Sequence, residues 1–182
     1  MGPGATEMAD TAERLQLETS AAGVAARRRP LGPLTFQPET FFLGRTEGAG
    51  LVRDPFGRIV RRCRVVTDGS FSPAQGAIRF DEVFSYDDGE VDTWRWVMTS
   101  GRDGRYLAAE AKAGSGITGE QRGDDYVIGF RRPIGRARGA LAPRFLTRFT
   151  LLAPDIALKQ AQVSLFGVPL GVLTALHRRT PA

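Results

Sequence analysis

The sequence predicts an all-β fold, an antiparallel β-barrel of about eight to ten strands. Three observations support this prediction. From Phe41 onward, apolar side chains recur at every second position, which is the period of a half-buried strand. Turn residues follow at intervals of about eight to twelve positions. With 22 glycines and 11 prolines among 182 residues, the chain also contains more helix-breaking residues than a helical bundle tolerates.

The first 34 residues are predicted to form a flexible tail, and residues 35–182 a single barrel domain. Within the tail, residues 11–26 are compatible with a weak helix, but their apolar residues are too sparse for a continuous apolar face. The run Arg27-Arg28-Arg29-Pro30 and the following Gly32-Pro33 pair end that segment. A chain of this length is long enough for one domain with a hydrophobic core.

Strands are predicted, in chain order, wherever apolar residues occupy alternate positions and so share one face. The groups that show this pattern are Ile59, Cys63 and Val65; Ile78, Phe80, Phe84 and Tyr86; Trp94, Trp96 and Met98; Tyr106 and Ala108; Tyr126, Ile128 and Phe130; Phe145, Phe149 and Leu151; and Leu173 and Ala175. Residues 54–57, 87–89, 102–104 and 122–124 have the composition of tight turns. Because no helical pattern separates the strands, hairpins are favoured over a parallel α/β arrangement.

Charge is unevenly distributed along the chain. The formal net charge is +5, and residues 126–182 contain nine basic residues against a single acidic one, Asp155. A basic surface of this kind can contact phosphate, an anionic membrane surface or an acidic partner. The basic residues are nevertheless spread through strands and loops and form no dense block, so a solvated basic surface is favoured and nucleic-acid binding is not expected.

The sequence gives no sign of a membrane-spanning or secretory segment. Its longest apolar candidate, residues 168–176, is much shorter than the roughly 20 residues that span a bilayer, and it contains Pro169 and Gly171. The N-terminus lacks the basic start, apolar centre and small-residue cleavage site of a secretory signal. We therefore expect a cytoplasmic protein.

Glu82 is the most informative candidate for a functional residue. It shares parity with Phe80 and Phe84, so it points to the apolar side of its strand. A carboxylate there must be paired with a cation, protonated, or used in binding or catalysis, because removing an unpaired charge from water is costly. Arg61 is the predicted partner, since it shares parity with Cys63 on what we expect to be a neighbouring strand. The pair would orient a ligand or act in acid–base chemistry. The alternatives are that the pair is a structural salt bridge, or that Glu82 lies in water at a strand edge.

Aromatic residues supply the predicted wall of a ligand site. Trp94 and Trp96, with Asp92 on the same side, are placed to line a pocket for a flat or apolar ligand, although alternating aromatics are also common in plain cores. The complete set of predicted ligand-binding residues is Arg61, Phe80, Glu82, Phe84, Tyr86, Trp94, Trp96 and Tyr106.

Several familiar chemistries are disfavoured. A hydrolase that uses His177 and Ser164 is disfavoured, because Ser164 is not in a Gly-x-Ser-x-Gly elbow. His177 is interpreted as a strand-end side chain. The glycines of residues 114–119 lack the helix and the Lys-Ser/Thr pair of a phosphate loop. With one histidine and one cysteine, Cys63, the chain has neither a Cys/His zinc cluster nor an intramolecular disulfide, and Cys63 is expected to be an inert core residue. We expect no metal and no cofactor.

Five segments of the sequence together resemble a bacterial family. They are Phe42-x-Gly44-Arg45-Thr46-x-Gly48, Asp54-x-Phe56-Gly57-Arg58, Asp81-Glu82-x-Phe84-x-Tyr86-Asp87-Asp88-Gly89-Glu90, Trp94-Arg95 and Phe166-Gly167-Val168-x-Leu170-Gly171. On these residues the chain resembles the domain-of-unknown-function 3833 (DUF3833) family. The resemblance implies a lipocalin-like or calycin-like barrel without an established activity, and many members look like envelope lipoproteins.

The sequence departs from the family pattern in two places. It has no lipobox cysteine at its start, which argues against an envelope location. Residues 133–152 match loosely, and Gly135, Gly139 and Pro143 suggest a remodelled long loop. The resemblance carries no catalytic residues over to this chain.

The leading functional hypothesis is a barrel that binds a small hydrophobic molecule, such as a fatty acid, polyketide, terpenoid or quinone-like compound. The aromatic wall would supply affinity, and Glu82 with Arg61 would orient the ligand. One alternative is a cofactor-free isomerase or cyclase in which Glu82 exchanges a proton with the substrate. Another is a structural or partner-binding module that uses the basic C-terminal surface. The sequence leaves these three open.

Overall fold

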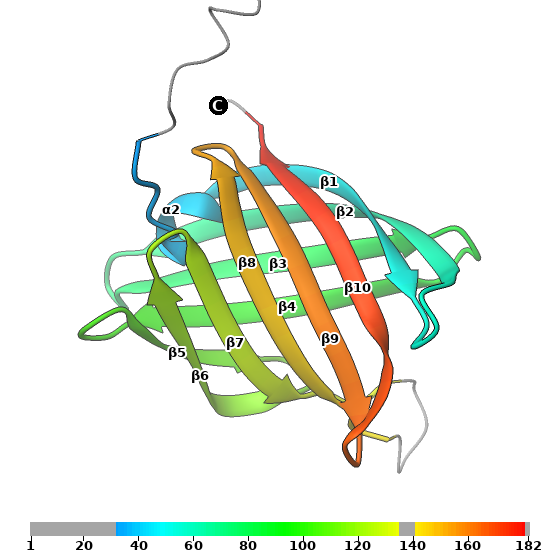
Figure 1. Cartoon of the computed structure of the whole chain (residues 1–182). Helices are drawn as coiled ribbons and strands as arrows, with labels where there is room; N and C mark the ends of the chain where they lie inside the picture. The colour runs from blue at the N-terminus through cyan, green and yellow to red at the C-terminus, as the bar shows by residue number, and fades with distance from the viewer. Residues whose placement is uncertain (1–31, 135–140, 181–182) are drawn as a thin grey trace, which may run out of the picture. The chain divides into compact units, whose positions relative to one another are not determined.

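The computed structural model of the chain describes residues 32–134 and 141–180. Apart from a four-residue helix, α2 (Pro38–Phe41), its regular elements are all strands (Figure 1). They are β1 (Gly44–Arg53), β2 (Ile59–Ser72), β3 (Ala77–Tyr86), β4 (Val91–Ser100), β5 (Arg105–Glu110), β6 (Gly114–Arg122), β7 (Asp125–Arg131), β8 (Arg144–Ala153), β9 (Ile156–Leu165) and β10 (Val168–Arg179). The predicted all-β class is therefore confirmed.

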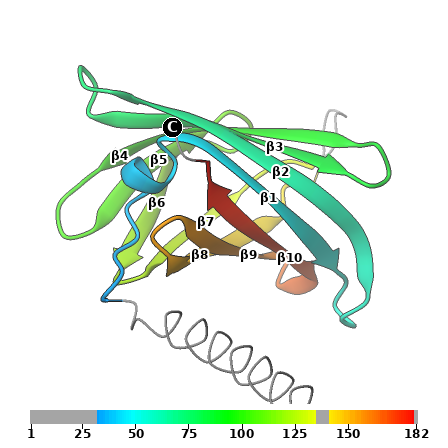
Figure 2. The ribbon, with the colours of Figure 1, turned by 90° about the horizontal axis from the view of Figure 1, so that it is seen from above.

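The ten strands form a closed antiparallel barrel (Figure 2). Each strand pairs with its neighbours in the chain, and β1 pairs with β10 to close the ring, with Thr46 opposite Arg179 and Arg53 opposite Val172. Closure satisfies the backbone groups of the first and last strands, which would otherwise be open edges. The predicted hairpin architecture and the strand number, at the upper end of the expected range, are both confirmed.

Alternate residues of each strand face the interior, as the sequence pattern predicts. On β3, for example, Ile78, Phe80 and Phe84 are buried while Arg79 and Asp81 are exposed. Close packing also depends on small residues. A Cβ atom on Gly119 of β6 would collide with the Tyr126 hydroxyl of β7, so glycine makes room for that ring.

One end of the barrel is filled by the segment that contains α2. Phe36 and Phe42, on either side of this helix, are fully buried. The Phe42 ring stacks on Phe80 of β3 with centroids 4.3 Å apart, and the Phe36 ring stacks on Tyr126 of β7 at 5.9 Å. The Tyr106 hydroxyl donates a 2.8 Å hydrogen bond to the Glu39 carboxylate. These contacts close the end of the barrel where β1 starts, and the opposite end is called the α2-distal end below.

Three predictions about segments need comment. The long loop expected from Gly135, Gly139 and Pro143 ends where β8 begins at Arg144, and Gly135 and Gly139 lie outside the described residues. The strand β9 was not recognised from alternation, since its inward positions hold small residues and a lysine.

The expected weak helix at residues 11–26 lies outside the described residues, and the division at residue 34 stays a prediction. The described part of the chain contains no helix with the length and apolarity that a bilayer crossing requires.

Candidate functional site

A buried ion pair lies in the middle of the barrel. Lys159 Nζ on β9 donates hydrogen bonds to both carboxylate oxygens of Glu82 on β3, at 2.7 and 2.9 Å. Both side chains are at most 2% exposed. The ammonium group also lies 4.8 to 5.2 Å from the ring centroids of Phe84, Trp94 and Phe149. Contact with ring faces adds to the attraction between the two charges and partly replaces the lost hydration of Lys159.

Unpartnered polar groups surround this ion pair. His177 on β10 is fully buried, its Nε2 atom is 4.0 Å from a Glu82 oxygen, and neither ring nitrogen has a hydrogen-bond partner among the described residues. Burial, followed by the nearby Lys159 charge, lowers the pKa of His177 to about 3, so the ring is neutral at pH 7. The hydroxyls of Thr67 and Thr147 are likewise buried and unpartnered in this part of the chain. These five residues, Thr67, Glu82, Thr147, Lys159 and His177, form the central polar cluster.

Aromatic rings fill the remaining interior next to this cluster. Trp94 packs edge-on against Phe145 with ring centroids 5.1 Å apart, and Phe130 stacks on Phe145 at 5.4 Å. The cavity beside the central polar cluster is only about 10 Å³. Its wall consists of Phe80, Glu82, Trp94, Trp96, Met98, Ile128, Phe130, Thr147, Phe149 and Lys159. That space is about what one water molecule needs, so in this conformation the barrel interior is packed.

A second group of charged residues lies toward the α2-distal end. Arg132, which follows β7, is 1% exposed and donates two hydrogen bonds to Asp92 at the start of β4, at 2.7 and 3.0 Å. Its guanidinium carbon lies 4.2 Å from the centre of the Trp94 ring. Burial opposes ionisation of Asp92, but hydrogen bonds from Arg132 and Lys112 outweigh it and hold the pKa of that carboxyl below its usual range. Glu110 accepts hydrogen bonds from the backbone N–H groups that follow it. Asp92, Glu110, Lys112 and Arg132 are called the Arg132 cluster.

The predicted pairing of Glu82 with Arg61 is wrong. Arg61 lies at the α2-distal end of β2, where it donates hydrogen bonds to Asp88 and Glu90 at 2.7 and 2.8 Å. Its guanidinium carbon is 3.7 Å from the centre of the Tyr86 ring. Arg61 does share a face of β2 with Cys63, as predicted. It does not reach Glu82, because Thr67 is the residue opposite Glu82 in the β2–β3 register. His177 does lie near the end of β10, as interpreted, but its side chain is buried and faces the interior.

Most of the other predicted site residues do face the interior. Phe80, Glu82, Trp94 and Trp96 meet around the small cavity. Phe84 is buried beside them, and Tyr86 stacks on Phe84 nearer the α2-distal end, with centroids 6.3 Å apart. Tyr106 lies apart from this group, because its hydroxyl contacts Glu39 at the α2 end. Cys63 is buried, and burial raises the pKa of its thiol, as expected of an inert core residue.

Sequence reasoning missed Lys159 and Arg132. A signal for Lys159 was present, because Ala157, Lys159 and Ala161 occupy alternate positions and the two alanines leave room for a long inward side chain. Arg132 had no comparable signal, since it follows the last residue of its strand. No group of three or more His, Cys, Asp or Glu residues suited to a metal ion occurs within residues 32–134 and 141–180.

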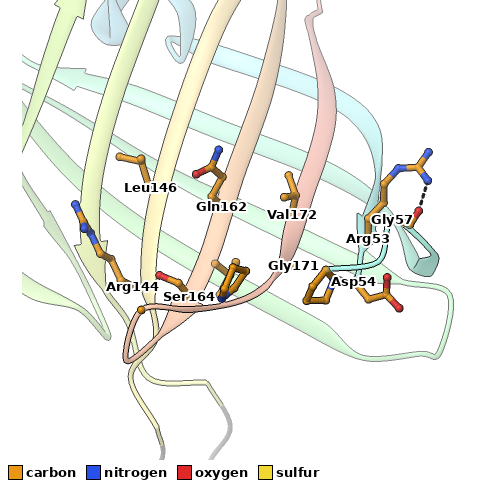
Figure 3. A pocket seen from close by; sticks show the side chains of 13 residues that line it. Arg53, Asp54, Gly57, Arg144, Leu146, Gln162, Ser164, Gly171 and Val172 are labelled. Carbon is orange, nitrogen blue, oxygen red and sulfur yellow. Dashed lines mark hydrogen bonds between the residues drawn. The ribbon is translucent and has the colours of Figure 1, made fainter.

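The outer surface has a larger hollow at the α2-distal end (Figure 3). Its volume is about 700 Å³, and it lies between the β1–β2 turn and the β9–β10 hairpin. Arg53, Asp54 and the adjacent Gly171 line one side, and Arg144 and Ser164 line the other. The Arg53 guanidinium donates a 2.7 Å hydrogen bond to the Gly57 carbonyl across the β1–β2 turn. This feature is called the rim hollow.

The fold and interior define a closed ten-stranded antiparallel barrel with a buried polar cluster. A family model described as a protein of unknown function, DUF3833, matches residues 22–179, and the chain therefore belongs to this family. The expected family membership is confirmed.

Two solved structures have a similar fold. One is the S-type phycobiliprotein lyase CPES from Guillardia theta, with a TM-score of 0.57 and 15% identity over 81% of this chain and 94% of that chain. The other is a protein of unknown function from the DUF3598 family of Nostoc punctiforme, with a TM-score of 0.55 and 12% identity over 81% of this chain and 50% of that chain. At these identities the likeness concerns the fold. A search of curated proteins finds no match.

Proposed function

We propose that the barrel binds a small, largely hydrophobic molecule that carries no charge and places a hydrogen-bonding oxygen beside the central polar cluster. The observation that supports this most strongly is the set of unpartnered polar atoms on His177, Thr67 and Thr147, buried among aromatic rings. Buried polar groups are normally hydrogen-bonded, and each one left without a partner costs about 1 to 3 kcal/mol. A ligand oxygen placed among them would remove part of that cost.

The charges of the cluster favour an uncharged ligand over a fatty-acid anion. Glu82 and Lys159 neutralise each other, and His177 is neutral at pH 7 because its pKa is lowered to about 3. An incoming carboxylate would therefore be a buried charge without a counter-charge of its own. A neutral imidazole and two hydroxyls instead offer donors and acceptors suited to a carbonyl or hydroxyl group. Quinone-like, terpenoid and polyketide molecules satisfy this requirement.

Binding requires the aromatic side chains next to the central polar cluster to move. Ligand pockets typically measure about 300 to 1,000 Å³, whereas the interior cavity is about 10 Å³. The rings of Trp94, Phe130 and Phe145 occupy the space between the central polar cluster and the Arg132 cluster. We propose that the ligand takes the place of part of this layer and stacks on the rings that remain.

The acid–base alternative is less well supported by the geometry. Both carboxylate oxygens of Glu82 accept hydrogen bonds from Lys159, so Glu82 would have to leave that partner before it could take a proton from a substrate. His177 is the only other candidate base in the cluster, and its low pKa makes it a weak one. The similar phycobiliprotein lyase fold is compatible with either a binding protein or an enzyme.

Ligand binding is tested with a matched pair of probes, 1-decanol and decanoate. Trp94 and Trp96 are the only two tryptophans and both are buried in the interior, so their fluorescence reports occupancy directly. The proposal expects decanol to change the emission at lower concentration than decanoate at pH 7. Native mass spectrometry of protein purified from its own host, followed by organic extraction, then identifies the natural ligand.

Two variants on adjacent residues of β8 locate the site. Phe145 is buried in the aromatic layer, whereas Leu146 points outward and is exposed. Phe145→Ala should open a cavity and tighten decanol binding, and Leu146→Ala should behave like the parent. An interior site is ruled out if neither the parent nor Phe145→Ala responds to decanol, or if Leu146→Ala changes binding as much as Phe145→Ala does.

A further inference from the structure

Exposed apolar side chains gather at the α2-distal end, on two turns, at the start of β10 and on the described residues between β7 and β8. The three segments are neighbours because β1 pairs with β10, β10 with β9, β9 with β8 and β8 with β7. Between β7 and β8, only residues 132–134 and 141–143 are described. The exposed residues are Phe56, Ile134, Leu141, Phe166, Val168 and Leu170, and both phenylalanines are 85% exposed. Single exposed apolar residues are ordinary, but a group of them on neighbouring loops marks an interaction surface.

Phe166 has a conformation that folding alone does not explain. It occupies the tip of the β9–β10 hairpin with φ at 49°, in the left-handed region that bulky residues rarely adopt. Asparagine or glycine would fit this position with less strain. Because the ring is 85% exposed, burial does not compensate for the strain. A strained and exposed aromatic residue at a loop tip is therefore evidence for a contact with something outside the chain.

Arginines with no acidic partner accompany these apolar residues. Arg58, Arg131 and Arg144 belong to or flank the same three segments, and no carboxylate within residues 32–134 and 141–180 lies within 4.0 Å of their side chains. Arginines elsewhere do pair with nearby acids, as Arg45 and Arg122 do toward the α2 end and Arg61 does at the α2-distal end. This surface is therefore positive as well as apolar. Its described residues are called the basic apolar rim: Phe56, Arg58, Arg131, Ile134, Leu141, Arg144, Phe166, Val168 and Leu170.

The rim hollow lies within this surface. Asp54 and Gly57 of the β1–β2 turn, Gly167 and Pro169 of the β9–β10 segment and Arg144 at the start of β8 all line it. Its volume of about 700 Å³ is in the range of sites that hold small molecules. An open depression between apolar loop tips and beside an arginine has the right composition for a phospholipid headgroup and the start of its chains.

We propose that the basic apolar rim docks on the surface of an anionic phospholipid bilayer. The phenylalanines of the β1–β2 and β9–β10 loops would enter the boundary between headgroups and acyl chains, as apolar side chains of interfacial proteins do. The arginines would lie over the lipid phosphates, where each basic residue contributes to binding. This inference concerns the outer rim and does not depend on the proposed ligand in the barrel interior.

The shape of the surface favours a bilayer over a protein partner or a second copy. Phe56 and Phe166 lie on two separate turns, and Val168 and Leu170 continue from the second turn into β10. A bilayer surface requires only that several tips reach the same plane with positive charge behind them.

The test is co-sedimentation of the full chain with vesicles of phosphatidylcholine alone and of phosphatidylcholine mixed with phosphatidylglycerol. Binding should require the anionic lipid and weaken as salt is added. Arg58→Gln with Arg144→Gln should lower the partition coefficient about 25-fold, at about fivefold for each arginine. The matched control is Arg102→Gln in the β4–β5 turn at the α2 end, which should leave binding unchanged.

Phe166→Asn separates a docking role from a structural one. The substitution removes strain, so the midpoint of denaturant unfolding should stay the same or rise, while vesicle binding should fall about tenfold or more. Leu107→Asn on the outer face of β5, also an exposed apolar residue, is the control and should bind like the parent. Phe145→Ala in the interior should leave vesicle binding unchanged, so failure of the ligand proposal can be told apart from failure of this one.

Three results would overturn the proposal. The first is equal binding to vesicles with and without phosphatidylglycerol, or no binding to either. The second is an equal loss in the control and rim variants. The third is a parent protein that self-associates on size exclusion without lipid and becomes monomeric on Phe166→Asn, since the rim would then contact a second copy.

Discussion

His177 makes the stability of the barrel depend on pH in a way that can be worked out from one residue. It is the only histidine in the chain, and burial lowers its pKa in the folded state to about 3, against 6.5 when it is exposed. Below pH 6.5 the unfolded chain therefore binds a proton that the folded chain does not. The free energy of unfolding is fully retained above pH 6.5 and falls as the pH drops toward 3.

The size of the effect follows from the two pKa values. Each pH unit between 6.5 and 3 removes about 1.4 kcal/mol per proton, so acidification from pH 7.5 to 5 should remove about 2 kcal/mol. This is a large fraction of the about 5 to 15 kcal/mol that holds a typical domain together. Few carboxylates titrate in that window, which makes the histidine contribution the main one.

The assay is urea unfolding of the parent and of His177→Gln at a series of pH values, followed by the fluorescence of the two buried tryptophans. His177→Gln changes the absolute stability, but its curve should lack the loss between pH 7.5 and 5 that the parent shows. Nuclear magnetic resonance of the His177 ring gives the pKa directly. Parallel pH dependence in the two proteins, or a ring that titrates near pH 6.5, would refute the reasoning.

Three further predictions concern the interior. Lys159→Met leaves Glu82 as an unpaired buried charge and should cost about 3 to 5 kcal/mol in chemical denaturation, and adding Glu82→Gln should recover much of that loss. Arg132→Met should cost a similar amount by leaving Asp92 without its main partner, whereas the neighbouring exposed Arg131→Met should change stability by less than about 0.5 kcal/mol. Phe42→Ala removes the ring that stacks on β3 and should lower stability by about 3 to 5 kcal/mol in the same measurement.

Much of the fold could be predicted from the sequence, because most strands of this barrel have one apolar side. Trp94, Trp96 and Met98 identify the inward face of β4, and the two aspartates and one glycine at residues 87–89 mark the turn before it. Strand β9 was missed, because outward Leu158 and inward Lys159 reverse the expected pattern. Its existence is dictated by closure of the barrel, a property of the whole chain that no local pattern records.

The candidate site could be predicted only in part. Parity placed Glu82 in the interior, since that follows from its own strand. Its partner depends on which strand crosses the barrel opposite β3, and Lys159 is far away in the sequence. Arg61 was predicted as the partner because it is on the neighbouring strand. Neighbouring strands, however, belong to the same wall of the barrel. A side chain that fills the interior instead meets residues from the opposite wall.

The pairing of β1 with β10 also sets the order in which the barrel can be completed. Every other pair of neighbouring strands is a hairpin formed between consecutive segments, but closure joins the beginning of the barrel sequence to its end. We expect local hairpins to form early and the ring to close last, because long-range contacts are slow to form. Until residues 168–179 have been synthesised, the backbone groups of Gly44–Arg53 remain an open edge, available to any other unfinished chain. Protection of that edge during synthesis is therefore a requirement built into the topology.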